Sequence, residues 1–229
     1  MPNVMGVDSR FVRGRIRFMQ KIILASGSPR RKEILELLGL EFEIAESLYD
    51  EDKIQTDDPI ELVEELSLQK ALAVAKRYPD AIVVGGDTTV TFGEGWMGKS
   101  NTREEAKKMF GGLLGKTHQV VTGVAVVNSL TGESFVGHET GEVTFREGSE
   151  AELEAYVANE RNWRGFAGAY ALQGGAAPFV LNQTGKLSAI IGMPVELLTE
   201  LLEQAGIVVE VDPREVEDNL RGMKVGIDE

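Results

Sequence analysis

The 229-residue sequence contains no cysteine, which excludes disulfide bonds, thiol catalysis and cysteine-ligated metal sites. It has only two histidines, His118 and His138, so a zinc site is not expected. It also lacks an apolar run of about 18 residues, so neither a membrane span nor a membrane partner is predicted. The absence of cysteine fits a reducing compartment, and we expect a cytoplasmic protein.

Positive charge is also scarce in this chain. It has 24 Lys and Arg residues against 37 Asp and Glu residues, which gives a net charge of −13. This balance argues against a nucleic-acid partner, because nucleic-acid binding relies on a basic surface. An acidic protein that binds phosphates must gather its cations locally, so the positions of individual Lys and Arg residues become informative.

The segment 21–32 carries the strongest local signal. Its apolar residues 22–25 predict a short buried strand, which is followed by a turn of small residues, Ser26-Gly27-Ser28. Ser28 suits the N-cap of a helix, Pro29 its first position and Gly39 its end. A strand that enters a helix in this way directs free backbone N–H groups at one point, and the helix dipole makes that point attractive to an anion.

Two arginines adjoin the same turn. Arg30 and Arg31 fall in the first turn of the expected helix, and guanidinium groups can bind a phosphate through two hydrogen bonds. The segment therefore favours a phosphate site. The alternative is an ordinary connection between a strand and a helix, with arginines on the surface.

Strand and helix signals alternate along the rest of the chain, without an internal repeat or a linker. They predict one α/β domain over residues 19–211, with a mixed β-sheet flanked by helices. Within it we expect a short buried strand at 81–84, a hairpin that starts at 88 and a last strand at 207–211. Residues 1–18 are interpreted as a basic, dispensable arm or the product of an upstream start codon, with a phosphate-contacting arm as the alternative. Residues 212–229 are expected to be a charged tail containing a short helix.

Lys70 and Asp87 interrupt otherwise apolar patterns. In the helix expected over 58–78, helical spacing places Lys70 on the same stripe as Val63 and Leu66, so its ammonium either extends to solvent or meets an anion. Asp87 follows the apolar run 81–84 and two glycines. This is a position where α/β enzymes place catalytic groups, although an Asp can also cap a local turn there.

Further candidate residues come from the polar segments. Lys99 ends the expected hairpin, and the acidic loop 50–52 is either a solvated turn or a source of a second carboxylate for a metal ion. Carboxylates together with phosphate oxygens suit Mg²⁺. The sequence therefore favours Mg²⁺ over zinc, with Mn²⁺ as the alternative.

Together these segments resemble the Maf family of nucleotide pyrophosphatases over most of the chain, from residue 19 to about residue 201. The matching motifs, in order along the chain, are Ala25-Ser26-Gly27-Ser28-Pro29-Arg30-Arg31, Asp50-Glu51, Lys70-Ala71, Gly86-Asp87-Thr88, Gly98-Lys99, Glu105-Ala106, Gly115-Lys116-Thr117-His118, Thr122-Gly123-Val124, Gly168-Ala169-Tyr170-Ala171-Leu172-Gln173-Gly174 and Gly192-Met193-Pro194. The resemblance implies a mixed α/β fold related to the inosine triphosphatases, two-lobed around a central cleft, and a homodimer.

The resemblance also implies an activity and roles for residues. Family members are house-cleaning hydrolases that cut nucleoside triphosphates between the α and β phosphates, which yields a nucleoside monophosphate and pyrophosphate. The implied phosphate contacts are Ser26, Arg30, Arg31, Lys70 and Lys99. The implied ligands of the divalent metal are Glu51 and Asp87, with Asp87 also the candidate general base and Lys70 and Lys99 acting with it in catalysis.

Two positions indicate the substrate within this resemblance. Thr88 and Gln173 match the branch that acts on dTTP and UTP, so a pyrimidine nucleoside triphosphate is the expected partner. Departures from the family pattern at 165–168 and at 185–187 concern the side of the pocket that holds the base. The alternative function is a non-catalytic regulator that senses nucleotides or acts in division and septum formation.

Overall fold

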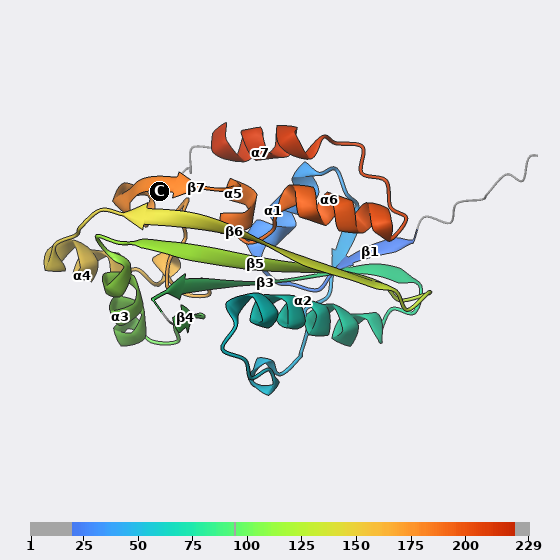
Figure 1. Ribbon diagram of the computed structural model, residues 1–229, viewed down its shortest axis with the longest axis horizontal. Helices are drawn as coiled ribbons and strands as arrows, with labels where there is room; N and C mark the ends of the chain where they lie inside the picture. The colour runs from blue at the N-terminus through green and yellow to red at the C-terminus, as the bar shows by residue number, and fades with distance from the viewer. Residues whose placement is uncertain (1–19, 94, 223–229) are drawn as a thin grey trace, which may run out of the picture.

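The computed structural model describes residues 20–93 and 95–222 (Figure 1). The arm expected at residues 1–18 lies outside the described residues. Within them, seven strands form one mixed sheet in the order β2-β1-β3-β5-β6-β7, with β4 paired to β3. β1 is parallel to both β2 and β3, whereas the remaining pairings are antiparallel. The predicted α/β class and the mixed sheet flanked by helices are confirmed.

The elements have the following bounds. The strands are β1 (Lys21–Leu24), β2 (Phe42–Ile44), β3 (Ala81–Phe92), β4 (Gly95–Met97), β5 (Thr117–Asn128), β6 (Ser134–Phe145) and β7 (Val180–Thr184). The α-helices are α1 (Pro29–Leu37), α2 (Pro59–Ala75), α3 (Arg103–Leu113), α4 (Glu150–Ala158), α5 (Leu187–Ile190), α6 (Val195–Gln204) and α7 (Pro213–Gly222). Short 3₁₀ turns are η1 (Glu51–Lys53), η2 (Glu160–Asn162) and η3 (Ala177–Phe179).

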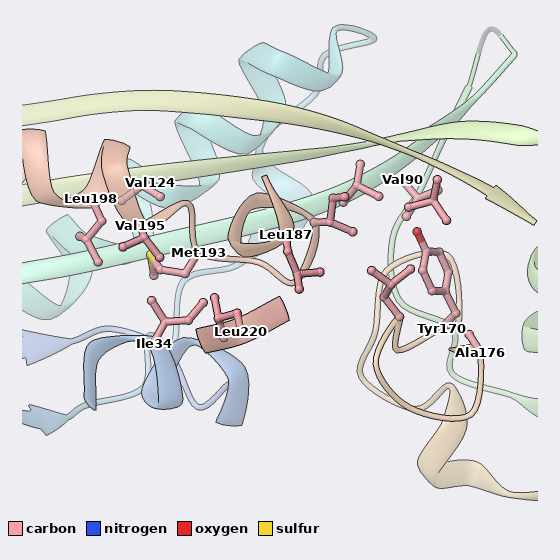
Figure 2. Close-up of a cluster of buried hydrophobic side chains, with 14 of the residues drawn as sticks. Ile34, Val90, Val124, Tyr170, Ala176, Leu187, Met193, Val195, Leu198 and Leu220 are labelled. Atoms are coloured by element: carbon pink, nitrogen blue, oxygen red, sulfur yellow. The ribbon is translucent and has the colours of Figure 1, made fainter. Parts of the chain in front are cut away.

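Helices cover both faces of the sheet (Figure 1). α2 lies against one face, and α1, α5 and α6 lie on the other, with α7 packed outside them against α5 and α6. α3 and α4 lie near one end of the long strands. The larger hydrophobic cluster fills the space under the second group of helices and includes Ile34, Leu187, Leu198 and Leu220 (Figure 2). A smaller cluster lies under α2.

The observed ends of α1 and the start of α3 match the signals in the local sequence. α1 begins with Pro29 at its first position, and Gly39 follows its end with a positive φ of 69°. Ser28 is the N-cap of α1, but its side chain makes no capping hydrogen bond. α3 begins with a complete capping box between Thr102 and Glu105.

Two strand predictions were wrong. The short strand at 81–84 and the first arm of the hairpin form one strand, β3, because β5 pairs with it from Ile82 to Thr91 across both glycines. The expected strand at 207–211 is not a strand. No described strand pairs with this segment, although Ile207, Val209 and Val211 pack against the main hydrophobic cluster.

The C-terminal helix is part of the packed body of the protein. α7 lies in the segment that the sequence set apart as a charged tail, yet Val216 and Leu220 are each only 1% exposed and belong to the main cluster. Among the described residues, no helix is both long enough and apolar enough to cross a membrane.

Candidate functional site

The site is built around an opening in one edge of β3. β1 pairs with residues 81–84 of β3, and β4 pairs with residues 90–92. Between these pairings, residues 85–89 have a strand neighbour only on the β5 side within the described chain. Ala25 N donates to Val84 O at 2.8 Å, so by strand alternation the backbone groups of Gly86 and Thr88 also face this opening.

A cavity of about 510 Å³ occupies this opening, a volume typical of small-molecule sites. The sequence-predicted residues that line it are Ser26, Arg30, Arg31, Asp87, Thr88, Lys99 and Gln173. The turn 26–28 and the first turn of α1 form one wall, so the N–H groups at the start of this helix adjoin the cavity. Lys70 and Glu51 do not line the cavity and lie behind Asp87.

Arg31 holds three segments together at the cavity wall. Its Nε donates to Gly192 O at 2.9 Å, its Nη1 to Ser26 Oγ at 3.0 Å and its Nη2 to Thr88 Oγ1 at 3.3 Å. Burial lowers the pKa of Arg31 below its ordinary value, against the opposing charges of Asp87 and Glu51. The group stays cationic, because a guanidinium does not lose its proton in proteins.

Thr88 is engaged in a chain of hydroxyl groups. Its Oγ1 accepts from Arg31 and lies 3.0 Å from Thr122 Oγ1, which in turn donates to Ala189 O at 2.8 Å. Because the Thr122 hydrogen is committed to Ala189, Thr88 donates to Thr122. The hydrogen of the Thr88 hydroxyl and one of its two lone pairs are therefore used by protein groups.

Asp87 leaves β3 on the opposite face of the sheet from Thr88, as strand alternation requires. There Lys70 Nζ on α2 donates to Asp87 Oδ1 at 2.6 Å and lies 2.8 Å from Glu51 Oε1 on η1. The side chains of Lys70 and Asp87 are 10% and 11% exposed, whereas that of Glu51 is half exposed. The Lys70 ammonium therefore does not extend to solvent. Of the two outcomes that the sequence left open, the structure shows the one in which it meets anions, here the carboxylates of Asp87 and Glu51.

Two glycines let α2 approach the sheet closely enough for this contact. A Cβ on Gly85 would lie 2.2 Å from Ser67 O, and one on Gly123, which pairs with Asp87 across the sheet, would lie 2.3 Å from Val63 O. Both acceptors belong to the backbone of α2 and cannot move alone. The missing side chains thus set the distance between Lys70 and Asp87.

The charges around Glu51 favour its ionised form. Partial burial acts to raise the pKa of Glu51, but the hydrogen bond from Lys70 and the charges of Lys70, Lys99 and Arg31 outweigh burial and lower the pKa. Lys99 follows β4, is exposed, and is held by an isolated bridge to Ala167. Arg30 donates to Glu33 Oε2 at 3.1 Å while it lines the cavity.

The other end of the cavity is mainly apolar. Its floor includes Val90, Val120, Tyr170, Leu172 and Ile190. Gln173 lines this end, and its Nε2 donates to Leu220 O on α7 at 3.1 Å.

Behind the apolar end, Tyr170 OH lies 2.8 Å from Nε2 of the buried His118. Burial lowers the pKa of His118 to about 4, so the imidazole is neutral at pH 7. Burial also raises the pKa of Tyr170, which therefore remains a phenol. This pair supports the cavity floor and is not placed to exchange protons near pH 7.

Some site residues escaped the sequence reasoning. Thr122 and Gly192 were present in matching motifs, but their contacts depend on β5 register and on the chain path after α5. Glu46, which follows β2 in the structure, also lines the cavity and had no functional signal in the sequence. Of the departures from the family pattern, Phe166 lines the cavity, whereas Lys186 pairs with Glu139 and Glu196 and does not.

An open sheet edge, a helix N-terminus with two arginines and a buried Lys–Asp pair define an α/β protein with a site for an anionic ligand. Residues 21–205 match the family described as Maf-like protein. Proteins named dTTP/UTP pyrophosphatase from Bacillus anthracis, Bacillus cereus and Bacillus thuringiensis subsp. konkukian are each 44% identical over 191 residues, which is 83% of this chain and 98% of each relative. The chain belongs to the Maf-like family, which confirms the resemblance drawn from its motifs.

Among solved structures, a HAM1 protein from Coxiella burnetii aligns with 90% of this chain and with 100% of its own chain, at 16% identity and a TM-score of 0.43.

Proposed function

We propose that this protein is a hydrolase that cleaves dTTP and UTP into a nucleoside monophosphate and pyrophosphate, as a house-cleaning enzyme. The observation that carries the proposal is the buried Lys70–Asp87 pair at the edge of a cavity whose other wall is the N-terminus of α1 with its arginines. A protein that only binds a nucleotide has no need of a buried carboxylate held beside the phosphate site. The names of relatives that are 44% identical support the substrate class.

The phosphate chain lies along the α1 wall. Its negative charge is met by Arg30, Arg31, Lys99 and the free N–H groups at the start of the helix. Ser26 and Arg31 are already fixed to each other, so little reorganisation is needed when the phosphates bind. The pyrophosphate leaving group is stabilised by the same cations.

Asp87 is the general base in this mechanism. Its Oδ1 is committed to Lys70, and its Oδ2 has no hydrogen-bond partner among the described residues, which leaves that oxygen to accept a proton from water. The water oxygen bonds to the α phosphorus as the bond to the bridging oxygen breaks. The bond electrons leave with pyrophosphate, and the water proton passes to Asp87.

The carboxylates of Glu51 and Asp87 would hold a divalent cation, Mg²⁺ or alternatively Mn²⁺. The fit rests on their oxygen donors and on the lowered pKa of Glu51, which keeps it ionised. No group of three or more His, Asp or Glu residues suited to a metal occurs among the described residues, so the cation would also need oxygen ligands from the phosphates and from water. When bound, the cation neutralises charge on the phosphates.

The base lies at the apolar end of the cavity beside Gln173. Because the Thr88 hydroxyl is occupied, Thr88 acts by holding Arg31 and Thr122 in place, and Gln173 supplies the polar group that meets the base edge. The enzyme acts in the cytoplasm, where nucleotides are used for nucleic-acid synthesis. The homodimer implied by the resemblance stays a prediction.

The test is turnover with product identification. The full-length protein is incubated with Mg²⁺ and, separately, dTTP, UTP, CTP, ATP or GTP in ¹⁸O-labelled water, with a metal-chelated control. We expect monophosphate and pyrophosphate from dTTP and UTP, with the label in the monophosphate. Release of orthophosphate would contradict cleavage between the α and β phosphates. Binding without turnover of any nucleotide would favour the alternative function, a non-catalytic regulator that senses nucleotides.

A further inference from the structure

The helix α7 makes two separate contacts near the cavity, one with Gln173, which lines it, and one with the start of α5, which precedes the lining residues 190–192. Its residue Leu220 accepts, through the backbone carbonyl, the Nε2 hydrogen bond of Gln173 at 3.1 Å. One turn earlier, the carboxylate of Glu217 accepts from the backbone N–H groups of Leu187 and Ser188 at 2.5 and 3.2 Å. Residues 213–222 lie outside the segment 21–205 that matches the family, so this helix is an addition to the matched region.

The Gln173 contact fixes which end of the amide faces the cavity. Leu220 O is an acceptor, so the side-chain atom bonded to it must be the NH₂ group. The carbonyl oxygen Oε1 of Gln173 has no hydrogen-bond partner among the described residues, while the residue itself lines the cavity. The anchored amide therefore offers an acceptor to the ligand.

The Glu217 contact holds a second part of the cavity wall, which residues 190–192 form. Leu187 and Ser188 begin α5, and the chain that follows supplies Ala189 O to Thr122 and Gly192 O to Arg31. Ile190, Ile191 and Gly192 then line the cavity. Glu217 is only 9% exposed and belongs to the helix whose Val216 and Leu220 are buried in the main core, so its carboxylate is held rigidly (Figure 2 shows Leu220 in one cluster with Ile34, Leu187 and Met193).

We propose that α7 is a positioning element of the base pocket, which holds Gln173 through Leu220 and the 187–192 wall through Glu217, and so selects uracil and thymine over cytosine. This inference rests on the proposed function. Uracil and thymine carry an N–H donor at ring position 3, which the anchored Oε1 accepts. Cytosine carries an acceptor at that position, so the two lone pairs would face each other without a hydrogen. If Gln173 were released, its amide could rotate and offer NH₂ to cytosine instead.

The experiment compares selectivity and stability in matched variants. Glu217→Gln weakens the cap of α5, and a chain that ends at residue 211 removes α7 together with its contact to Gln173. Asp218→Asn is the control, because it removes the same charge from an exposed position on the same helix. Should the truncated chain fail to fold, Leu220→Ala loosens the anchor while it keeps the helix. The readouts are kcat/KM for UTP and CTP, and melting temperature.

We expect the UTP/CTP ratio to fall about tenfold in the truncated chain, or in Leu220→Ala, and to fall in Glu217→Gln, while Asp218→Asn retains it. In a Gln173→Ala background, Leu220→Ala should cause no further fall, because Leu220 acts on the base through that side chain. Variants that lose stability but keep the wild-type ratio would overturn the proposal and leave α7 a purely structural helix.

The Kd values of UTP and CTP, measured without divalent metal, separate this inference from the proposed function. If the wild type binds UTP selectively but does not hydrolyse it, the pyrophosphatase proposal fails while the positioning role is still tested by the Kd ratios. If the wild type hydrolyses pyrimidine nucleotides and α7 variants have unchanged ratios, only the positioning role fails.

Discussion

The Nζ of Lys70 lies 2.6 Å from Oδ1 of Asp87, although the two residues are on different elements and each side chain is about one-tenth exposed. A helix facing one side of the sheet thus delivers a cation to a carboxylate at the open edge of β3. The ammonium group holds the Asp87 carboxylate in a fixed orientation, as a general base must be held.

Replacement of Asp87 by Asn should abolish turnover and leave nucleotide binding largely intact. The amide keeps the shape and can still accept a hydrogen bond from Lys70, but it cannot take a proton from water. We expect kcat to fall by at least about 100-fold. Asp57→Asn, at an exposed position, is the control. Near-normal kcat in Asp87→Asn would remove Asp87 from the mechanism.

Replacement of Lys70 by Met should reduce both activity and stability. The structure shows Lys70 paired with Asp87 and Glu51. Its loss leaves a buried carboxylate without a partner, at a cost on the order of 3 kcal/mol. Urea unfolding at pH 7 measures this, and Lys70→Met/Asp87→Asn should recover stability without recovering activity. A single variant as stable as the wild type would contradict the argument.

Arg31→Lys should reduce kcat/KM by at least about tenfold, because an ammonium cannot reach Gly192, Ser26 and Thr88 at once. The neighbouring Lys32→Gln, which is exposed and pairs only with Glu36 in the described chain, should leave kcat/KM unchanged. Steady-state kinetics with UTP distinguish the two outcomes. Equal activity of Arg31→Lys and wild type would show that charge alone suffices at this position.

Stability should fall as the pH is lowered through the range in which His118 titrates. Burial lowers the pKa of His118 to about 4 from 6.5 in the unfolded chain, so between these values the unfolded state binds the extra proton. The free energy of unfolding should therefore drop by about 2 kcal/mol from this residue between pH 7 and pH 5. His118→Gln should lose this component of the pH dependence, whereas His138→Gln should retain it. Identical pH profiles for wild type and His118→Gln would contradict the assignment.

Gly123→Ala should destabilise the protein by about 1–3 kcal/mol and slow turnover, since its Cβ would push α2 away from the sheet and separate Lys70 from Asp87. Gly112→Ala is the matched control, because it lies within α3 with open space around the added carbon and should stabilise by up to about 1 kcal/mol. Denaturant unfolding and kcat for both variants test this contrast.

The sequence predicted the helices and most strands because their signals are local: apolar spacing, Pro29 and Gly39 at the ends of α1, and the capping box of α3. It misplaced Asp87 at a strand end because two glycines usually interrupt a strand, whereas here the long β5 keeps β3 paired through them. The occupied hydroxyl of Thr88 depends on register with Thr122, and the role of Leu220 depends on where α7 packs. Neither relationship leaves a pattern in the local sequence.

The opening at residues 85–89 of β3 also bears on how the sheet edge resists aggregation. An unpaired strand edge can pair with a strand of another molecule and so seed aggregation. Here the unpaired stretch is short, because β1 and β4 occupy the edge on either side of it. Arg30, Arg31 and Lys99 stand around it as like charges. The same arrangement that admits a phosphate chain therefore denies an approaching β-strand both the length and the neutral surface that it needs.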